Sequence, residues 1–585
     1  MSHSQSKMNS KYLFTGNSVH NFSVNEHYIT WRWTQIIYGS FFNKRVKDVL
    51  IETKSVLSVK RLEVSRTCCN FDLKSDTSNA TGFILRCATR KKSGHWTIQT
   101  WNVICHPSEV DDRVSQIKLY RELANPNRPK SLLVFINPYG GKRQAEVIFY
   151  QTVRPIFDLA GIRSTVIVTS YQGHCQKYML TEDIHSYDGV VTVGGDGLFS
   201  ELLQGLLYRT RADAKLPLYE QHKPFSKELT PRLRIGLIPA GSTNTVIHSV
   251  HGTENVETAA LHIALGQDIG VDVLAIHDLS TKEFLRYTVS LLGYGFHGDI
   301  LDPSERIRWL GPFRYDVVGA IEWLKLASYK CRIAYVSSIS STPLDTGMCA
   351  ASCPVCLKLD SECEDGNLAS ESPQAKTDAL LDKTDDDRHS PLTKGGDESS
   401  SPPESCPPFA ASSSCQPWHT CSEPPWDDIN AANSEIGEFS ENIGRSPWRV
   451  TTGRFVAVNA FLISCRCSKS PWGPAPSAHL GDGCLDLILV RRCSRYQYLR
   501  YLLYLTERRK GKHAGHLRLP FVEAYRVCAF QLQALDRDGV PVASENIAAQ
   551  GTSVWCVDGE VLRNPNIICC VHRQLIRIFG RGPEA

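Results

Sequence analysis

Residues 187–207 read YDGVVTVGGDGLFSELLQGLL: a continuous apolar run, a glycine-rich turn, and then apolar residues at helical spacing. A short apolar run without alternation is typical of a parallel strand that is covered on both faces. The same order occurs in residues 131–157, SLLVFINPYGGKRQAEVIFYQTVRPIF, and in residues 233–250, LRIGLIPAGSTNTVIHSV. Three such units predict an open, parallel α/β sheet whose ligand binds at the carboxyl ends of the strands.

Each unit carries a glycine-rich loop at the end of its strand. Backbone N–H groups of glycines approach phosphate oxygens closely, and the helix that follows offers its positive end. Neither GxxxxGK[ST] nor GxGxxG occurs at these strand ends, so the P-loop and dinucleotide fingerprints are not met. One such loop would be an ordinary turn, but three in register predict a phosphate site. The loops are Asn137-Pro138-Tyr139-Gly140-Gly141-Lys142, Gly194-Gly195-Asp196-Gly197 and Gly241-Ser242-Thr243-Asn244.

Asp196 stands between two glycines at a strand end, close to the expected phosphates and unhindered. It is our candidate general base, which would take the proton from an attacking hydroxyl, a role worth about 10²–10⁴-fold in rate. The structural alternative, compatible with the first, is that its carboxylate caps a helix over residues 198–207. Positioning and charge stabilisation by a metal ion and by cations would supply the remaining acceleration.

Residues 11–125 have the pattern of one β-rich module. Its strand segments are rich in β-branched and aromatic residues and are separated by polar turns, and a helix over about 107–123 closes the module. Several strands and one terminal helix are typical of a pleckstrin-homology domain. A basic cluster between two strands suits a phosphoinositide headgroup, with a solvated loop as an equal alternative. The strand segments are residues 28–37, 56–64, 82–89 and 96–103, and the cluster is Arg86, Arg90, Lys91 and Lys92.

The α/β unit spans residues 128–268, and beyond it the signals are mainly those of strands. They predict a second, β-rich domain over residues 269–356 and 447–582, expected to be a β-sandwich. Between its parts, residues 357–446 are dense in Ser, Pro, Asp and Glu. Such a tract cannot bury enough apolar surface to offset its ordering entropy, so we expect a disordered insert. The predicted fold class is therefore multidomain, α/β plus β.

Composition narrows the setting in which the chain works. With 585 residues, 42% hydrophobic and 22% charged, it is typical of globular proteins, and a net charge of +4 gives no reason to expect nucleic acid. No run approaches 18 apolar residues, and the N-terminus MSHSQSKMNSKYLF lacks the apolar region of a secretory signal. We therefore expect a cytoplasmic protein with peripheral membrane contact, whose 21 cysteines are reduced thiols.

The combination of GGDG, PAGSTN and a late DGE resembles the catalytic fold shared by diacylglycerol, sphingosine and ceramide kinases. VFINPYGGK, SLLGYGFHGDI, RWLGPFRYD and FVEAYRV are similar to the ceramide kinases in particular, and the resemblance runs from about residue 128 to 581 outside the insert. It implies transfer of the γ-phosphate of ATP to the primary hydroxyl of ceramide, with Mg²⁺ and also Ca²⁺ as cofactors, at Golgi and plasma membranes. The alternatives are a sphingosine or diacylglycerol kinase, and a non-catalytic, ceramide-kinase-like lipid-binding regulator.

The resemblance also assigns roles to residues. It places Asp196 as the general base in a loop, Gly194 to Gly197, that faces the lipid hydroxyl, with Asp558 as a rival base. From the residues alone, Asp558-Gly559 is a common hairpin turn. Arg308 and Arg314 are, from the residues alone, surface charges, although guanidinium groups are also able to clamp phosphates. The implied ATP contacts are Asn137, Pro138, Tyr139, Gly140, Gly141, Thr169, Ser170, Tyr171, Gln172, Gly173, Glu201, Gly241, Ser242, Thr243, Arg308, Arg314, Asp558, Gly559 and Glu560.

One position departs from the family pattern. Ceramide kinases tend to place a substrate-side aspartate where this chain has Pro303. We expect Asp302, next to it, or Asp299 to take that role in contacting the lipid substrate.

Cys349, Cys353 and Cys356 form CxxxCxxC, again as in ceramide kinases. Three thiolates at this spacing are able to hold Zn²⁺, with a fourth ligand from elsewhere, for which Cys465 and Cys467 are candidates. Reduced cysteines on a loop are an equal alternative.

Residues 490–513, VRRCSRYQYLRYLLYLTERRKGKH, are basic and amphipathic, with Tyr498, Leu502 and Leu505 at helical spacing. Such a helix suits calmodulin or an anionic membrane. More often it packs on a core and leaves its basic face in solvent, which is the interpretation we favour.

Overall fold

The computed structural model describes residues 19–37, 43–62, 81–216, 228–242, 244–311, 313–338, 342–345, 347–357, 448–467, 469–509, 514–542 and 551–584. Apart from Leu357, the tract for which the sequence predicts disorder lies outside these residues. So does Thr243, one of the expected nucleotide contacts.

The N-terminal residues form two three-stranded antiparallel sheets and one helix. The elements are β1 (Val19–Val24), β2 (Tyr28–Ile37), β3 (Asn43–Glu52), β4 (Val56–Leu62), β5 (Thr81–Arg90), β6 (Trp96–Cys105) and α1 (Pro107–Ala124). Apolar side chains of both sheets, among them Trp31 and Phe83, are buried together with Val110 and Ile117 of α1. The four expected strands and the closing helix are confirmed as elements, and the structure adds β1 and β3.

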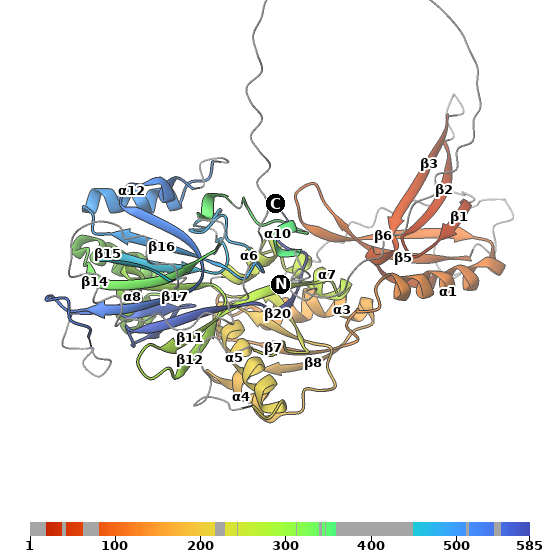
Figure 1. The fold of residues 1–585 in the computed structure, drawn as a ribbon. Helices are drawn as coiled ribbons and strands as arrows, with labels where there is room; N and C mark the ends of the chain where they lie inside the picture. The colour runs from red at the N-terminus through yellow and green to blue at the C-terminus, as the bar shows by residue number, and fades with distance from the viewer. Residues whose placement is uncertain are drawn as a thin grey trace, which may run out of the picture. The chain divides into compact units, whose positions relative to one another are not determined.

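Four parallel strands follow, in the spatial order β10-β9-β7-β8. The elements of this part are β7 (Ser131–Ile136), α2 (Ala145–Ile148), α3 (Arg154–Ala160), β8 (Arg163–Val168), α4 (His174–Thr181), β9 (Gly189–Gly194), α5 (Asp196–Asp213), β10 (Arg234–Pro239), α6 (Thr245–His251) and α7 (Val256–Leu265). Side chains of β7 alternate between two apolar layers. Leu133 and Phe135 pack with α4 and α5, and Leu132 and Val134 pack with α3 and α7 (Figure 1). Burial on both faces explains the continuous apolar run in the sequence.

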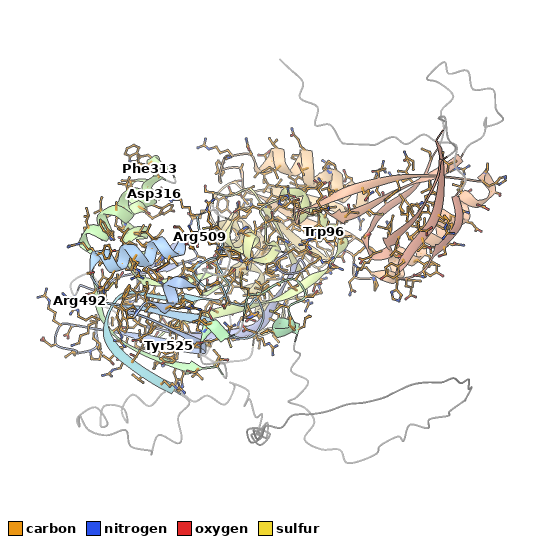
Figure 2. All side chains as sticks on the ribbon, turned by 90° about the horizontal axis from the view of Figure 1, so that it is seen from above. Trp96, Phe313, Asp316, Arg492, Arg509 and Tyr525 are labelled. Atoms are coloured by element: carbon orange, nitrogen blue, oxygen red, sulfur yellow. The ribbon has the colours of Figure 1, made fainter. Side chains whose placement is uncertain are left out.

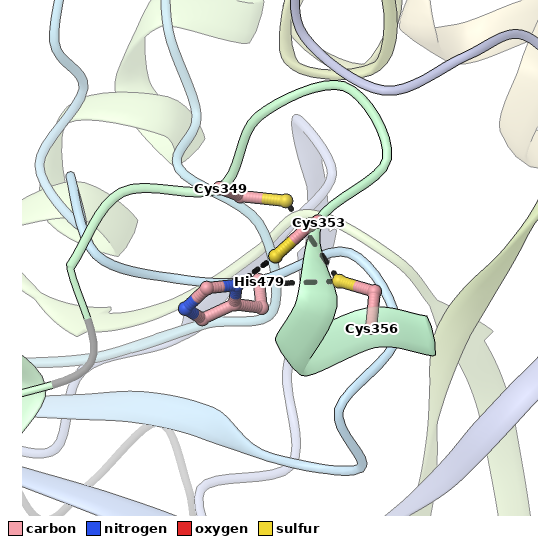
Figure 3. A group of neighbouring side chains, drawn as sticks. All are labelled: Cys349, Cys353, Cys356 and His479. Carbon is pink, nitrogen blue, oxygen red and sulfur yellow. Dashed lines mark hydrogen bonds between the residues drawn. The ribbon is translucent and has the colours of Figure 1, made fainter. Parts of the chain in front are cut away.

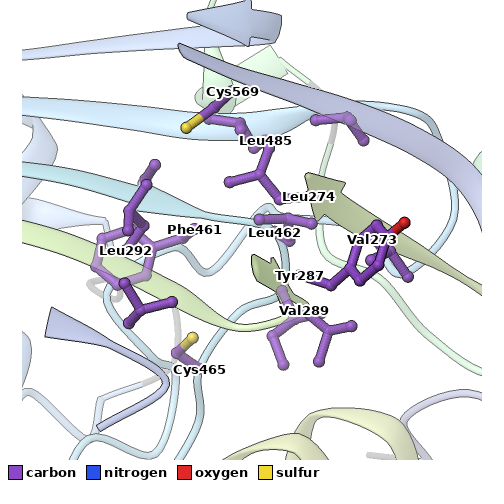
Figure 4. Close-up of a cluster of buried hydrophobic side chains, with 14 of the residues drawn as sticks. Val273, Leu274, Tyr287, Val289, Leu292, Phe461, Leu462, Cys465, Leu485 and Cys569 are labelled. Carbon is purple, nitrogen blue, oxygen red and sulfur yellow. The ribbon is translucent and has the colours of Figure 1, made fainter. Parts of the chain in front are cut away.

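The remaining strands extend the same sheet to 14 strands. They are β11 (Asp268–Asp278), β12 (Phe284–Thr288), β13 (Leu291–Gly295), β14 (Tyr329–Ser337), β15 (Trp448–Phe461), β16 (Leu485–Arg491), β17 (Val522–Leu535), β18 (Trp555–Val557), β19 (Glu560–Leu562) and β20 (Ile567–Phe579). Their core includes Val273 of β11, Phe461 of β15 and Leu485 of β16 (Figure 4). The mixed α/β architecture is thus confirmed, and a separate sandwich stays a prediction.

Strand β20 connects the two parts of this sheet. It pairs in parallel with β10, where Ile578 lies opposite Ile235, and antiparallel with β11 and β17. The parallel strands that carry the glycine-rich loops are therefore completed by the most C-terminal strand of the sheet.

The described residues of the second part contain the helices α8 (Phe296–Arg306), α9 (Phe313–Lys325), α10 (Pro354–Leu357) and α12 (Arg495–Leu505). Ser494 and Gln497 form a capping box that starts α12. Tyr498 and Tyr501 of this helix are buried, whereas Arg500 faces solvent, so one face of the helix packs on the core as expected. None of the helices in the described ranges is long and apolar enough to cross a membrane.

Candidate functional site

The glycine-rich loops meet at one edge of the parallel strands. From β7 the chain crosses to β8 on one side, whereas β9 and β10 lie on the other side, so the order of strands reverses between β7 and β9. In open α/β sheets ligands bind at such a reversal, outside the carboxyl ends of the strands. Asn137 N donates to Val193 O at 3.1 Å, and Ala240 N donates to Gly194 O at 2.9 Å. The first and third loops are thus both hydrogen-bonded to β9.

The first and third loops also touch each other. Gly141 has a φ of +55°, and a Cβ at this position would lie 2.5 Å from Ala240 O and 2.8 Å from Gly241 C. Only glycine fits both the left-handed backbone and this contact. Asn137 Oδ1 accepts from Tyr139 N at 2.9 Å, and Asn244 Oδ1 accepts from Gly241 N at 3.1 Å. Side-chain amides therefore fix the conformation of both turns.

Asp196 is the first residue of α5, but its carboxylate does not cap that helix. It accepts hydrogen bonds from Thr245 N at 3.0 Å and Val246 N at 3.1 Å, in the first turn of α6. The expected capping role is thus real but belongs to a different helix. Burial raises the pKa of Asp196 to about 6, with Asp558 adding repulsion, while the two N–H groups oppose the rise. A carboxylate with such a pKa is ionised at neutral pH and is a stronger base than an ordinary aspartate.

Asp558 faces the same place from the other part of the sheet. It lies in the turn between β18 and β19, where it and Gly559 have φ values of +49° and +84°, as in a type I′ hairpin. Its Oδ1 accepts from Ser290 Oγ at 2.5 Å, whereas its Oδ2 is buried with no hydrogen-bond partner among the described residues. The hairpin interpretation is confirmed, and the orphaned oxygen with Asp196 offers the ligands that Mg²⁺ prefers.

Arg286 on β12 is a site residue that sequence reasoning missed. Its Nη1 donates to Glu560 Oε2 at 2.8 Å and its Nη2 donates to Ser200 Oγ at 3.0 Å. It thereby links the DGE hairpin to α5, one helical turn after Asp196. A single arginine inside a strand gives no signal in the sequence.

The stretch after β8 is bound to α5 by Glu201. Its carboxylate accepts from the backbone N–H groups of Gly173 and Cys175 at the start of α4, and burial raises its pKa above the ordinary value. Tyr171 stacks on His174 with ring centroids 4.8 Å apart, and His174 Nδ1 accepts from Ser170 N. The structure thus places the expected contact Glu201 beneath the loop of residues 169–173 as its support.

A groove of about 470 Å³ opens beside this loop and the hairpin. It brings together three expected nucleotide contacts, Gln172, Gly559 and Glu560, with Asp302 and Glu305 of α8. Arg314 Nη2 contacts Glu305 Oε1 at 3.4 Å, so this arginine reaches the rim of the groove. The side chain of Arg308 lies outside the described residues.

The two aspartates near Pro303 have different surroundings. Asp302 lines the groove and accepts from Arg563 Nη2 at 2.7 Å. Asp299 is enclosed instead, where it accepts from Ser553 Oγ at 2.6 Å and from Tyr329 Oη at 3.0 Å, and burial raises its pKa to about 6. Of the two expected substrate-side carboxylates, Asp302 is the one that lies in the groove.

The cysteine motif forms a separate cluster, with a partner that the sequence did not suggest. Cys349, Cys353 and Cys356 gather around His479 (Figure 3). The candidate fourth ligands were wrong: the cluster contains neither Cys465 nor Cys467. Cys465 is instead close enough to Asp196 and Asp558 that their charges raise the pKa of its thiol further, after burial.

Comparisons with known proteins show which families this chain is similar to. Residues 131–276 match the diacylglycerol kinase catalytic domain, and residues 427–585 match the ceramide kinase C-terminal domain. Human ceramide kinase is 34% identical over 86% of this chain and 83% of its own length, and mouse ceramide kinase is 35% identical over 78% and 76%. The crystal structure of a diacylglycerol kinase from Bacillus anthracis str. Sterne superimposes with a TM-score of 0.40 at 12% identity, covering 78% of this chain and 99% of that one.

Proposed function

The chain belongs to the ceramide kinase family and is an ATP-dependent lipid kinase, and from that premise we propose that Asp196 activates the primary hydroxyl of ceramide for attack on the γ-phosphate of ATP. The observation that carries the proposal is the carboxylate itself. It stands at the end of β9 between the two mutually packed glycine-rich loops, and its pKa is raised to about 6. A base with a pKa just below the working pH combines ionisation with affinity for the proton.

The remaining groups divide between the nucleotide and the lipid. The loop of residues 137–142, which Asn137 holds in its turn, would direct backbone N–H groups at the phosphates. Gln172 and Glu560 would line the nucleotide side of the groove, and Asp302 the lipid side. Mg²⁺, with Ca²⁺ as the alternative oxygen-binding cation, would bind near Asp558 Oδ2 and neutralise phosphate charge. This carboxylate oxygen suits a cation because it is buried and has no hydrogen-bond partner among the described residues. Thr243, Arg308 and Arg314 remain expected phosphate contacts.

The substrate is tested by competition. Ceramide, sphingosine and diacylglycerol are offered together in mixed micelles with Mg²⁺·ATP carrying a labelled γ-phosphate, and the three products are separated. We expect ceramide 1-phosphate to dominate by at least about tenfold, since a matched polar contact is worth about 1.4 kcal/mol or more. Equal turnover of the three lipids would contradict the assignment of ceramide as the substrate.

A non-catalytic regulator is the alternative from a different class. The intact first glycine-rich loop and GGDG loop argue against it, because such a protein has no need of a phosphate cradle. Calorimetric titration with Mg²⁺·ATP separates the two proposals. Absence of measurable heat, together with absence of transfer, would favour the regulator.

We further infer that the enzyme reaches its lipid at a membrane surface, through an apolar patch on α9 and α12. Phe313 on α9 is 62% exposed, and Trp309, in the short 3₁₀ helix Arg308–Leu310 that precedes α9, is 81% exposed. Tyr496 and Leu503 on α12 are 77% and 62% exposed. The two helices are joined by Trp323 Nε1, which donates to Arg495 O at 3.1 Å. Figure 2 shows Phe313 on α9, with Arg492 and Arg509 near the two ends of α12. Apolar side chains beside arginines suit an anionic interface.

Phe313→Asp is therefore expected to weaken binding to phosphatidylcholine–phosphatidylserine vesicles about tenfold or more, because burying one aromatic ring is worth about 1.5–3 kcal/mol. Sedimentation with the vesicles measures it. Val540→Asp is the matched control, since Val540 is 57% exposed outside the patch. Equal losses in both variants would contradict a specific surface.

The N-terminal residues are proposed to be a pleckstrin-homology-like module that adds phosphoinositide contacts. Part of the predicted basic cluster is already engaged, because Arg90 Nε contacts Glu584 Oε2 at 3.2 Å. Exposed Lys91 and Lys92 in the β5–β6 turn would carry the interaction. Adding phosphatidylinositol phosphates to the same vesicles without any gain in binding would contradict it.

A further inference from the structure

Four potential metal ligands converge beside the described sheet, and three of them come from one short segment. The Sγ atoms of Cys349 and Cys356 are 3.8 Å apart, and Nδ1 of His479 lies 3.2 Å from Cys353 Sγ and 4.0 Å from Cys356 Sγ (Figure 3). All four ligand atoms lie within 4.8 Å of one another. The side chains of Cys349, Cys353 and His479 are buried, at 6%, 6% and 1% exposure.

These three distances are close to those of a tetrahedral metal site, and the other pairs lie within 4.8 Å. Zinc–sulfur bonds of about 2.3 Å and zinc–nitrogen bonds of about 2.0–2.1 Å place two sulfurs about 3.8 Å apart and sulfur about 3.6 Å from nitrogen. The observed distance between Cys349 Sγ and Cys356 Sγ, 3.8 Å, equals the expected sulfur–sulfur distance. The distances from His479 Nδ1 to Cys353 Sγ and Cys356 Sγ, 3.2 and 4.0 Å, lie on either side of the expected sulfur–nitrogen distance. A disulfide would need its sulfurs about 2.05 Å apart.

We propose that Cys349, Cys353, Cys356 and His479 bind one structural Zn²⁺ ion. Three soft thiolates and one imidazole in tetrahedral array favour zinc among the common divalent ions. Four protein ligands leave no open position, so the ion is structural and does not act on the substrate. The proposal does not depend on which lipid the enzyme phosphorylates.

The loop that carries His479 is fixed by charged groups. Arg526, which is 1% exposed, contacts Asp482 and donates to Asp486 Oδ1 at 2.7 Å and to Ser477 O at 3.4 Å. A buried guanidinium paired with two carboxylates holds residues on both sides of His479. The imidazole is therefore positioned before the metal arrives, which lowers the entropic cost of binding.

The cysteine segment is attached independently to the C-terminal residues. Gln574 Nε2 donates to Cys356 O at 2.7 Å and to Gly481 O at 2.8 Å, so one side chain of β20 joins the two halves of the cluster. Ala351 N donates to Pro583 O at 2.9 Å. The cysteines precede residues 358–447 and His479 follows them, so the ion would bind together two segments that are far apart in the chain.

Metal analysis of the full chain, purified without chelator after growth with zinc, tests the proposal. We expect about one zinc per chain in the wild type, and less than about a fifth of that in Cys353→Ser and His479→Ala, because loss of one of four ligands opens the site. Cys467→Ser is the matched control, a cysteine outside the cluster, and should keep its zinc. His479→Cys should also keep it, since four thiolates form a tetrahedral site as well.

Retention in His479→Cys separates a ligand from a residue that merely supports the fold. If His479→Ala does not fold, release of zinc from the wild type by a thiol-modifying mercurial, followed with a chromogenic chelator, tests whether thiolates hold the ion, and zinc retained by His479→Cys tests the position of His479. A wild type with less than about a tenth of a zinc per chain would overturn the proposal. So would unchanged zinc in Cys353→Ser, an equal loss in Cys467→Ser, or another metal bound in place of zinc.

Discussion

Replacing Asp196 by asparagine is expected to lower kcat for ceramide phosphorylation by about 10²–10⁴-fold, while the KM for Mg²⁺·ATP changes little. Asparagine has nearly the shape of aspartate but cannot accept the proton of the attacking hydroxyl at neutral pH. Its amide oxygen is still able to accept one of the hydrogen bonds from Thr245 and Val246, so α6 keeps part of its cap. Labelled phosphate transfer to ceramide in mixed micelles measures the loss.

The pH profile supplies the control for this result. A general base works only when deprotonated, so wild-type kcat/KM should fall as the pH drops through about 6, where Asp196 gains its proton. The residual activity of Asp196→Asn should not show this fall as the pH drops. Asp558→Asn is measured beside it, because its carboxylate is the rival base. Full activity in Asp196→Asn would mean that Asp196 only caps α6, and Asp558 would then be the candidate general base.

Gly141→Ala is expected to weaken Mg²⁺·ATP binding by about tenfold or more. Forcing alanine into a left-handed backbone costs about 1–2 kcal/mol, and the clash with the third loop adds to it, while about 1.4 kcal/mol already equals tenfold in affinity. A Cβ 2.5 Å from Ala240 O has no way to relax within the present loop, because its neighbour is backbone. The loops must separate, and the phosphate cradle between them is lost. Calorimetry with Mg²⁺·ATP checks the affinity.

Gly197, in the second loop, makes a matched control for this prediction. A Cβ there would meet nothing within 4 Å, and its φ is not positive. Gly197→Ala should therefore bind Mg²⁺·ATP within about threefold of the wild type, since small strain-free substitutions cost about 0.5 kcal/mol or less. If both variants bound alike, contact between the loops would not be what shapes the site.

Much of the site follows from local sequence. A continuous apolar run followed by glycines predicts a buried parallel strand that ends in a tight turn, and β7, β9 and β10 each confirm the strand. Phosphate binding by these turns stays a prediction. Strands in parallel order then bring their loops to one edge without further information. The position of Asp196 follows from this alone, although its partner helix does not, because the choice between α5 and α6 depends on how the two helices pack.

Residues that act through distant partners gave no such signal. Arg286 contacts Glu560, 274 positions later in the chain, and His479 lies 126 positions from Cys353. Periodicity and spacing report only on near neighbours, so a lone arginine in a strand or a lone histidine in a loop is indistinguishable from any other. The same limit makes Cys465 and Cys467 possible fourth ligands from the sequence alone, because they share the residue type of the motif but not its place in the fold.

The position of β20 also bears on how the protein is made. On the ribosome, β10 emerges early, yet the neighbour of Ile235 is Ile578, in the strand that is synthesised after all others of the described sheet. Until then one edge of the nascent parallel sheet stays open, with unpaired backbone groups and apolar side chains that favour association with other chains. Pairing at such sequence separation is also slow. We therefore expect the growing chain to depend most on chaperones in the interval between completing β10 and completing β20.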